Sequence, residues 1–215
     1  MKDFSNYQSD MFSCSYEGQT AVISLKSESL KMALESVHMH DILECLNAVE
    51  VDNNIKGVLA LDTADYEGMD VLKDFIKTIQ KESGYVQKEM GVTRYGNSVK
   101  RLTLAINDFS KPCVVGIQGK VPIDSFGYFL ACDYRIGTND LRIDFPGLKM
   151  GVTPTGAVSF FMKRQLGATK TLQLLMSGKK LSAADAKSLC LVNDLVSKKQ
   201  LKAACQAQLD RKSVV

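Results

Sequence analysis

Short apolar runs bounded by turn-forming residues recur along this chain, and they alternate with longer amphipathic stretches. Bounded apolar runs of this kind predict buried strands. The first two runs alternate by twos around Glu17-Gly18-Gln19, which predicts an opening hairpin. The predicted strands are Phe12–Tyr16, Ala21–Leu25, Val58–Leu61, Val114–Ile117, Arg135–Gly137 and Leu141–Phe145.

Apolar positions at helical spacing predict helices between these strands and throughout the chain after Pro154. Gly167 and Gly178 end two of them, and Ser182 with Asp185 forms a capping box at the start of a third. The polar stretch Ser83–Arg94 contains glycines and predicts a mobile loop. The predicted helices are Leu34–Val51, Val71–Lys81, Val99–Phe109, Phe126–Cys132, Ala157–Leu166, Thr169–Met176, Ala183–Leu189 and Lys199–Arg211.

Strand–helix alternation predicts an α/β fold. We divide it into a core of residues 1–156 and a C-terminal helical segment of residues 157–215. The apolar faces of the 157–176 helices exceed what a short tail can cover, which predicts oligomerisation through this segment.

Composition narrows the class of protein. The chain has 215 residues, 45% of them hydrophobic, and a formal charge of +3 without a basic cluster among aromatics, so nucleic acid is not an expected partner. The first twenty residues are polar and no apolar run approaches the ~20 residues of a membrane span, which predicts neither a signal peptide nor a membrane anchor. The six cysteines lack C-x-x-C spacing, which predicts buried reduced thiols in a cytoplasmic protein.

Motifs for a bound metal or nucleotide are missing from the sequence. His38 and His40 point to different faces of a predicted helix with no further ligands nearby, so we expect no metal site. The chain contains neither a Gly-x-Gly-x-x-Gly turn nor a P-loop, and we expect no nucleotide-binding motif of that kind.

The segment KPCVVGIQGKVPIDSFGYFLACDYRIGTNDLRIDFPGLKMGVTPTG, residues 111–156, carries a family resemblance. It is similar to the crotonase (enoyl-CoA hydratase/isomerase) superfamily, whose usual pattern is KPVIAAVNGxxxGGGCELALACDxRIA…FGQPEVKLGIxPGAGG. Residues 174–178, 181–186 and 191–193 continue the match. The matching positions are Lys111-Pro112, Gly119, Ala131-Cys132-Asp133, Arg135-Ile136, Pro146, Lys149, Gly151 and Pro154.

The resemblance implies a superhelix of ββα turns with a short C-terminal helical segment, a homo-oligomer (trimer or hexamer), and an acyl-CoA or acyl-carrier thioester as ligand. Coenzyme A would arrive as part of the substrate, and no separate cofactor is expected. The resemblance also implies an oxyanion hole of two backbone N–H donors, which fall on Met69 and Asp124. Tyr66, Glu67 and Gly68 would lie beside the first donor, although an exposed turn is the simpler interpretation. Lys26 is a candidate for the CoA phosphates, with Lys31 and Lys73, or else these are surface lysines.

The glutamates that act as base and acid in the family's hydratases fall on Gly127 and Gly147, so this chain is identified as a divergent member that lacks both. Asp124 and Asp144 are the replacement carboxylates that we consider catalytic candidates. The simpler interpretations are a helix N-cap for Asp124 and a surface cap or ion pair for Asp144. Residues of the predicted loop would line the acyl pocket in the family, or else be solvated: Tyr85, Glu89, Arg94 and Tyr95.

Two functions therefore remain open. The first is a lyase or isomerase that stabilises a thioester enolate without standard hydration. The second is a catalytically silent subunit that acts as a partner of an active enzyme.

Overall fold

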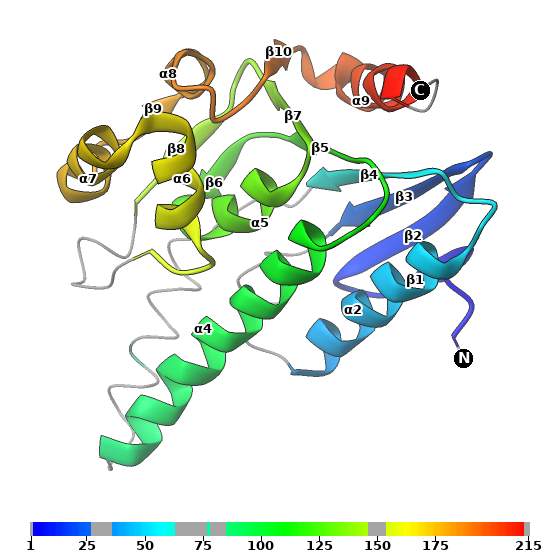
Figure 1. The fold of residues 1–215 in the computed structure, drawn as a ribbon, viewed down its shortest axis with the longest axis horizontal. Helices are drawn as coiled ribbons and strands as arrows, with labels where there is room; N and C mark the ends of the chain where they lie inside the picture. The colour runs from blue at the N-terminus through cyan, green and yellow to red at the C-terminus, as the bar shows by residue number, and fades with distance from the viewer. Residues whose placement is uncertain (1, 27–35, 63–76, 78–84, 146–153, 213–215) are drawn as a thin grey trace.

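The main sheet of the computed structural model begins with an antiparallel hairpin and continues as parallel strands (Figure 1). The structure describes residues 2–26, 36–62, 77, 85–145 and 154–212. The strands, in spatial order, are β1 (Asn6–Gln8), β2 (Phe12–Glu17), β3 (Thr20–Leu25), β4 (Gly57–Asp62), β5 (Cys113–Ile117), β7 (Tyr134–Thr138) and β10 (Asp194–Val196). β5 is buried along its whole length, as expected for a parallel strand with both faces covered. The predicted hairpin and buried strands are confirmed.

A second, smaller sheet lies beside the first and consists of β6 (Lys120–Pro122), β8 (Arg142–Asp144) and β9 (Leu181–Ser182). The chain passes from β5 to β6 and then into a helix, α5 (Phe126–Ala131), before it returns to β7 and β8. This repeated passage between two sheets is the predicted ββα arrangement, and the α/β fold class is confirmed. The prediction of helices alone after Pro154 was wrong, because β9 and β10 add a short strand to each sheet.

Most predicted helices are present with small shifts at their ends. The capping box of α8 is confirmed: Asp185 N donates to Ser182 Oγ at 3.2 Å, and Ser182 N donates to Asp185 Oδ2 at 2.9 Å. The predicted helix at 71–81 lies outside the described residues except for Lys77. The helices are α2 (Ser36–Val51), α4 (Tyr85–Asn107), α6 (Val158–Leu166), α7 (Ala168–Ser177), α8 (Ala183–Ser188), α9 (Leu201–Lys212) and the 3₁₀ turns η1 (Ile123–Ser125) and η3 (Lys198–Gln200).

The predicted loop at Ser83–Arg94 was wrong for residues 85–94, which form the first part of α4. Gln87–Met90 are strong helix formers, whereas a glycine such as Gly91 in a helix interior costs only about 1 kcal/mol relative to alanine. Because the residues that flank Gly91 favour a helix, the helix continues through it.

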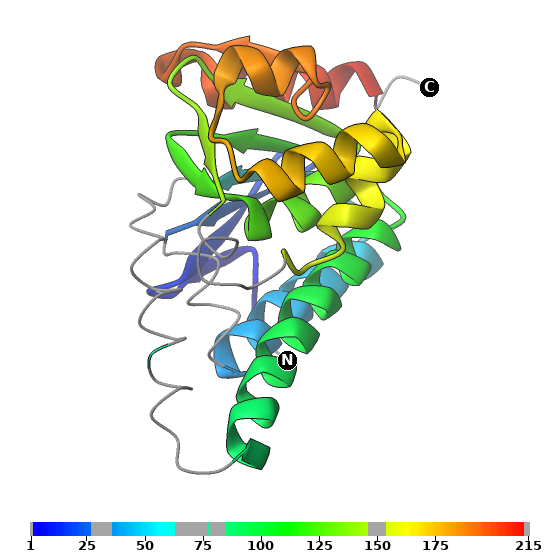
Figure 2. The ribbon, with the colours of Figure 1, turned by 90° about the vertical axis from the view of Figure 1, so that its left-hand side faces the viewer.

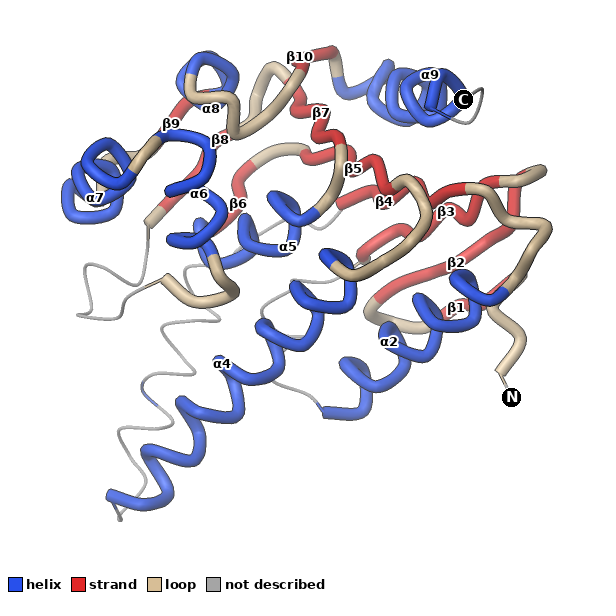
Figure 3. The backbone as a smooth tube through the Cα atoms, in the orientation of Figure 1, coloured by secondary structure: helices blue, strands red, loops and turns tan. Residues whose placement is uncertain are grey.

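Helices cover both faces of the main sheet (Figures 2 and 3). α9 packs on one face through Leu201, Cys205 and Leu209. Glycines on the strands make room for it: a Cβ atom built on Gly57 would lie 2.8 Å from Leu209 Cδ1, and one on Gly116 would lie 3.0 Å from Cys205 Sγ. α2, α4 and α5 contribute to the larger core on the other face.

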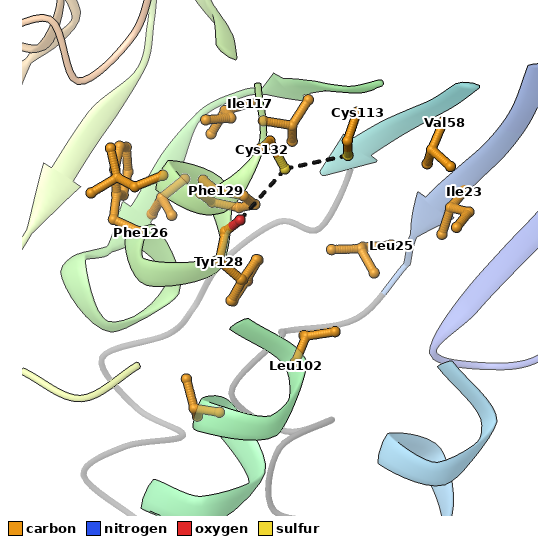
Figure 4. Packing of buried hydrophobic residues seen from close by; sticks show 14 of the residues in the cluster. Ile23, Leu25, Val58, Leu102, Cys113, Ile117, Phe126, Tyr128, Phe129 and Cys132 are labelled. Carbon is orange, nitrogen blue, oxygen red and sulfur yellow. Dashed lines mark hydrogen bonds between the residues drawn. The ribbon is translucent and has the colours of Figure 1, made fainter. Parts of the chain in front are cut away.

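The centre of that larger core lies between α5, α4 and the parallel strands (Figure 4). The Phe126 and Tyr128 rings both pack edge-on against Phe129, with centroid distances of 5.6 and 4.5 Å. The Sγ atoms of Cys113 and Cys132 lie 3.5 Å apart as free thiols. The expectation of buried cysteines is confirmed for five of the six, and Cys190 is the exposed exception.

Several residues that match the family pattern tie the backbone of this core together. Lys111 Nζ donates to the carbonyl oxygens of Val49 and Asp52, at the C-terminal end of α2, where a cation is favoured. Asp133 Oδ2 accepts from Cys113 N at 2.8 Å. The buried Arg135 donates to two carbonyl oxygens, those of Cys132 and Leu191.

In the part of the chain that the structure describes, no helix combines the length and the apolar character that crossing a membrane requires.

Candidate functional site

The candidate site is built around the start of α5, where three parts of the chain meet. β6 ends at Pro122, and η1 leads directly into α5. The turn at Thr155–Ala157 and the side of α4 that carries Thr103 pack against this point. Residues 123–130 are all buried, so the functional groups here act in a desolvated environment.

Asp124 is a buried carboxyl group on η1, only 3% exposed. Its Oδ1 accepts a hydrogen bond from Thr155 N at 3.0 Å and lies 3.4 Å from Thr155 Oγ1, which also donates to it. Its Oδ2 has no hydrogen-bond partner among the described residues. The N-cap interpretation does not hold, because Ser125 occupies the N-cap of α5 and the carboxylate binds Thr155 instead.

Burial dominates the titration of Asp124. It raises the pKa of the carboxyl group above its ordinary value, and the hydrogen bonds from Thr155 oppose this only in part. A carboxyl group with a raised pKa keeps its proton to higher pH, and its O–H is then a hydrogen-bond donor. The neutral form of Asp124 can therefore donate through Oδ2.

Gly127 is the second residue of α5, three positions after Asp124, and no side chain fits there. A Cβ atom built on it would overlap the carbonyl oxygen of Gly156 and lie 2.6 Å from the carbonyl carbon. Gly156 is itself confined, because a Cβ atom on it would lie 2.6 Å from Val99 Cγ1 and its φ is +64°. Thr103 Oγ1 lies 3.3 Å from Gly156 O and donates to it. The chain's own backbone thus occupies the space into which a side chain at position 127 would extend.

Asp144 ends β8 and is 3% exposed. Its Oδ2 forms ion pairs with Lys180 Nζ at 3.2 Å and Lys120 Nζ at 3.5 Å. A buried carboxylate is stable only when its charge is compensated, and these two ammonium groups provide that compensation. The ion-pair interpretation of Asp144 therefore holds, although the carboxylate itself lies beneath the surface.

The structure brings Asp124 and Asp144 to the same end of the small sheet but gives them different partners. Pro122, the register partner of Asp144 in the parallel pair, directly precedes η1. Lys26 lies apart, at the end of β3, where its Nζ donates to Gln8 Oε1 at 2.5 Å and to Ser9 O at 3.3 Å. Its predicted contact with phosphates stays a prediction.

Other predicted site residues lie outside the described residues: Tyr66, Glu67, Gly68 and Met69 in the segment 63–76, Gly147 in the segment 146–153, and also Lys31 and Lys73. The oxyanion hole of Met69 and Asp124 accordingly stays a prediction. Tyr85, Glu89, Arg94 and Tyr95 belong to α4 rather than to a loop.

Sequence reasoning missed Thr155 and Gly156, which hold Asp124 and close the space at Gly127. The turn signal at Pro154 marks their position, but no local pattern indicates which segment they contact. The same applies to Lys120 and Lys180, because only the register of β6, β8 and β9 brings them to Asp144.

Known proteins resemble this chain along most of its length. The profile of the enoyl-CoA hydratase/isomerase family matches residues 16–212. The fatty acid oxidation complex subunit alpha of Pseudomonas syringae pv. tomato is 25% identical over 187 residues, which cover 87% of this chain and 25% of that protein. A probable enoyl-CoA hydratase of Bacillus subtilis is 26% identical over 163 residues, 75% of this chain and 60% of that protein. The chain thus spans less than two thirds of the length of these relatives.

Solved structures share the fold at lower sequence identity. The enoyl-CoA hydratase of Bacillus halodurans superimposes with a TM-score of 0.79 at 21% identity, over 95% of this chain and 81% of that one. An enoyl-CoA hydratase/isomerase of Marinobacter aquaeolei gives a TM-score of 0.77 at 15% identity, over 95% and 77% of the two chains. Because the family profile extends over nearly the whole described fold, this chain belongs to the enoyl-CoA hydratase/isomerase family.

Proposed function

We propose that this protein binds an acyl-CoA or acyl-carrier thioester and stabilises the enolate formed from it, in an isomerisation, decarboxylation or C–C reaction rather than in hydration. Family membership supports the thioester, as do relatives named for enoyl-CoA hydration and fatty acid oxidation. The observation that carries the choice of reaction is Asp124, a buried carboxyl group with a raised pKa and an oxygen without a hydrogen-bond partner among the described residues.

The chemistry proposed for Asp124 depends on its protonation state. An enolate bears negative charge on oxygen, and donors aimed at that oxygen stabilise it most strongly in a desolvated site. A neutral Asp124 would donate its Oδ2–H to this oxygen, beside the backbone N–H groups of Met69 and Asp124. An ionised Asp124 would instead repel the enolate, so the raised pKa favours catalysis. Asp144 is the proposed base where the reaction removes an α-proton.

Standard hydration requires a group that activates water and a second that protonates the α-carbon. The resemblance aligns these groups with Gly127 and Gly147, neither of which has a titratable side chain. The backbone of Gly156 further prevents any side chain from extending from position 127. Each missing general acid or base removes a factor of ~10²–10⁴ in rate. Hydration of crotonyl-CoA is therefore expected at the background rate.

The test begins with thermal shift on a panel of acyl-CoAs, with free coenzyme A as the matched control. A thioester that raises the midpoint more than coenzyme A does is then assayed for turnover. Asp124→Ala should lower kcat by about 10²–10³-fold, the range for loss of one oxyanion donor, whereas Asp124→Asn keeps an N–H donor and should lose less. Unchanged turnover in both variants would exclude Asp124 from the mechanism, and robust hydration of crotonyl-CoA would show that the alignment of the glutamates is wrong.

The second candidate is a catalytically silent subunit that stabilises an active enzyme. The observations that favour it are the Gly156 backbone that fills the space at Gly127 and the two lysines that engage Asp144. A silent subunit predicts no thermal shift with any thioester, together with a gain in the activity or stability of an active family member on mixing. The acyl-CoA panel therefore separates the two candidates.

A further inference from the structure

A cavity of about 550 Å³ lies between α4 and α6. It shares Thr155 and Gly156 with the Asp124 site, but Leu104 of α4 and Phe160 of α6 form much of its wall. These two apolar side chains are 46% and 55% exposed. The volume lies within the ~300–1,000 Å³ range of small-molecule sites, and apolar walls of this kind are typical of them.

Positive charge accompanies the apolar wall. Lys100 precedes Leu104 by one turn of α4, and Arg164 follows Phe160 by one turn of α6; both cations line the cavity. The Arg164 guanidinium lies 5.6 Å from the centroid of the Phe160 ring, a cation–π distance that holds it at the cavity rim. The lining contains no Asp or Glu. Across the described ranges, neither Lys100 nor Arg164 has a carboxylate within ion-pair distance.

We propose that this cavity binds an amphipathic carboxylate, with its apolar chain against Leu104 and Phe160 and its carboxylate between Lys100 and Arg164. An apolar ligand alone would leave the two exposed cations without a counter-ion from the ligand. A small polar anion would leave the apolar wall in contact with water, so a ligand with both parts complements the lining best. The proposal does not rest on the thioester function proposed above.

The test is isothermal titration calorimetry of the full chain with decanoate, and with 1-decanol as the uncharged analogue. Decanoate should bind saturably at one molecule per chain, and more tightly than 1-decanol. Arg164→Gln and Lys100→Gln should each lower the affinity for decanoate by about threefold, since each removes one partly exposed ion pair. Both should leave the affinity for 1-decanol unchanged. Leu104→Gln should lower the affinity for both ligands, because it removes apolar contact with the alkyl chain of the ligand.

Two exposed positions away from the cavity provide matched controls: Lys170→Gln on α7 for the charge, and Val51→Gln at the end of α2 for the apolar side chain. Neither should change the affinity for decanoate. The proposal is overturned if decanoate does not saturate, if 1-decanol binds equally well, or if the cavity variants match the controls. It is also overturned if Leu104→Gln converts an oligomer to monomer, because a second copy of the chain then covers the cavity.

Discussion

At the scale of single residues, two features define the site: Gly127, which has no side chain, and the buried carboxyl group of Asp124. Gly127 allows the Gly156 carbonyl to approach α5. The same turn presents Thr155 to Asp124, so Gly156, which fills the space at position 127, directly follows Thr155, which binds the carboxyl group. A substitution at position 127 or at Asp124 should therefore shift this turn and alter the packing at both positions.

Gly127→Ala should lower the free energy of unfolding by about 2–3 kcal/mol or more, because the added methyl group overlaps backbone that has no rotamer to adopt. Gly96→Ala is the matched control within a helix, since nothing lies within 4 Å of a Cβ atom built there. It should raise stability by about 0.5–1 kcal/mol through helix propensity. Urea denaturation measures both, and equal midpoints for the two variants would contradict the close approach at Gly127.

Asp124→Asn should stabilise the protein increasingly as pH rises. The pKa of Asp124 is raised in the folded state, so its contribution to stability is complete below its unfolded pKa. That contribution is lost as pH rises through the raised folded value, whereas an asparagine does not titrate. Thermal unfolding of both proteins from about pH 4 to about pH 8 tests this, and the variant's advantage should grow over that range. A difference that does not change with pH would mean that Asp124 is not perturbed by burial.

At the scale of secondary-structure elements, several residues that match the family pattern connect one element to another through hydrogen bonds. Lys111 binds the end of α2, Asp133 binds the start of β5, and Arg135 spans Cys132 and Leu191. These contacts fix how β5, β7 and α2 sit together. A match carried by such residues indicates the fold strongly and the reaction only weakly, because the contacts are needed whatever chemistry the site performs.

α9 should contribute substantially to stability, because it packs on one face of the main sheet against buried residues of β3, β4, β5 and β7. Leu209 is 1% exposed, and its side chain packs against Gly57, where a Cβ atom would leave too little room. Leu209→Ala should therefore cost about 2–5 kcal/mol, the range for a buried leucine. Arg211→Ala, at an exposed position of the same helix, is the control and should be close to neutral. If Leu209→Ala were equally neutral in urea denaturation, α9 would not be docked as described.

At the scale of the whole molecule, the sequence predicted the order of most elements, because the longer strands and the helices carry their own apolar periodicity and end signals. It did not predict β1, β6, β9 and β10, which have only two or three residues each. The hairpin, the buried parallel strands and the capping box of α8 all follow from local patterns. The site was less predictable, since it depends on contacts between distant segments. Thr155 with Asp124, Gly156 with Gly127, and two lysines with Asp144 are set by topology and register, which no local pattern encodes.

The surface of α7 predicts self-association. Leu172 and Met176 lie one helical turn apart and are 58% and 75% exposed, so they form one apolar face on the exterior. We expect a second copy of the chain to cover this face in a trimer or hexamer, because burial of apolar side chains drives association. Light scattering at micromolar concentration should give a multiple of the chain mass.

The double variant Leu172→Lys, Met176→Lys should shift that mass toward the monomer, since two ammonium groups resist burial. The control Lys170→Gln should leave the mass unchanged. A monomeric wild type, or a double variant of unchanged mass, would show that α7 is not the interface.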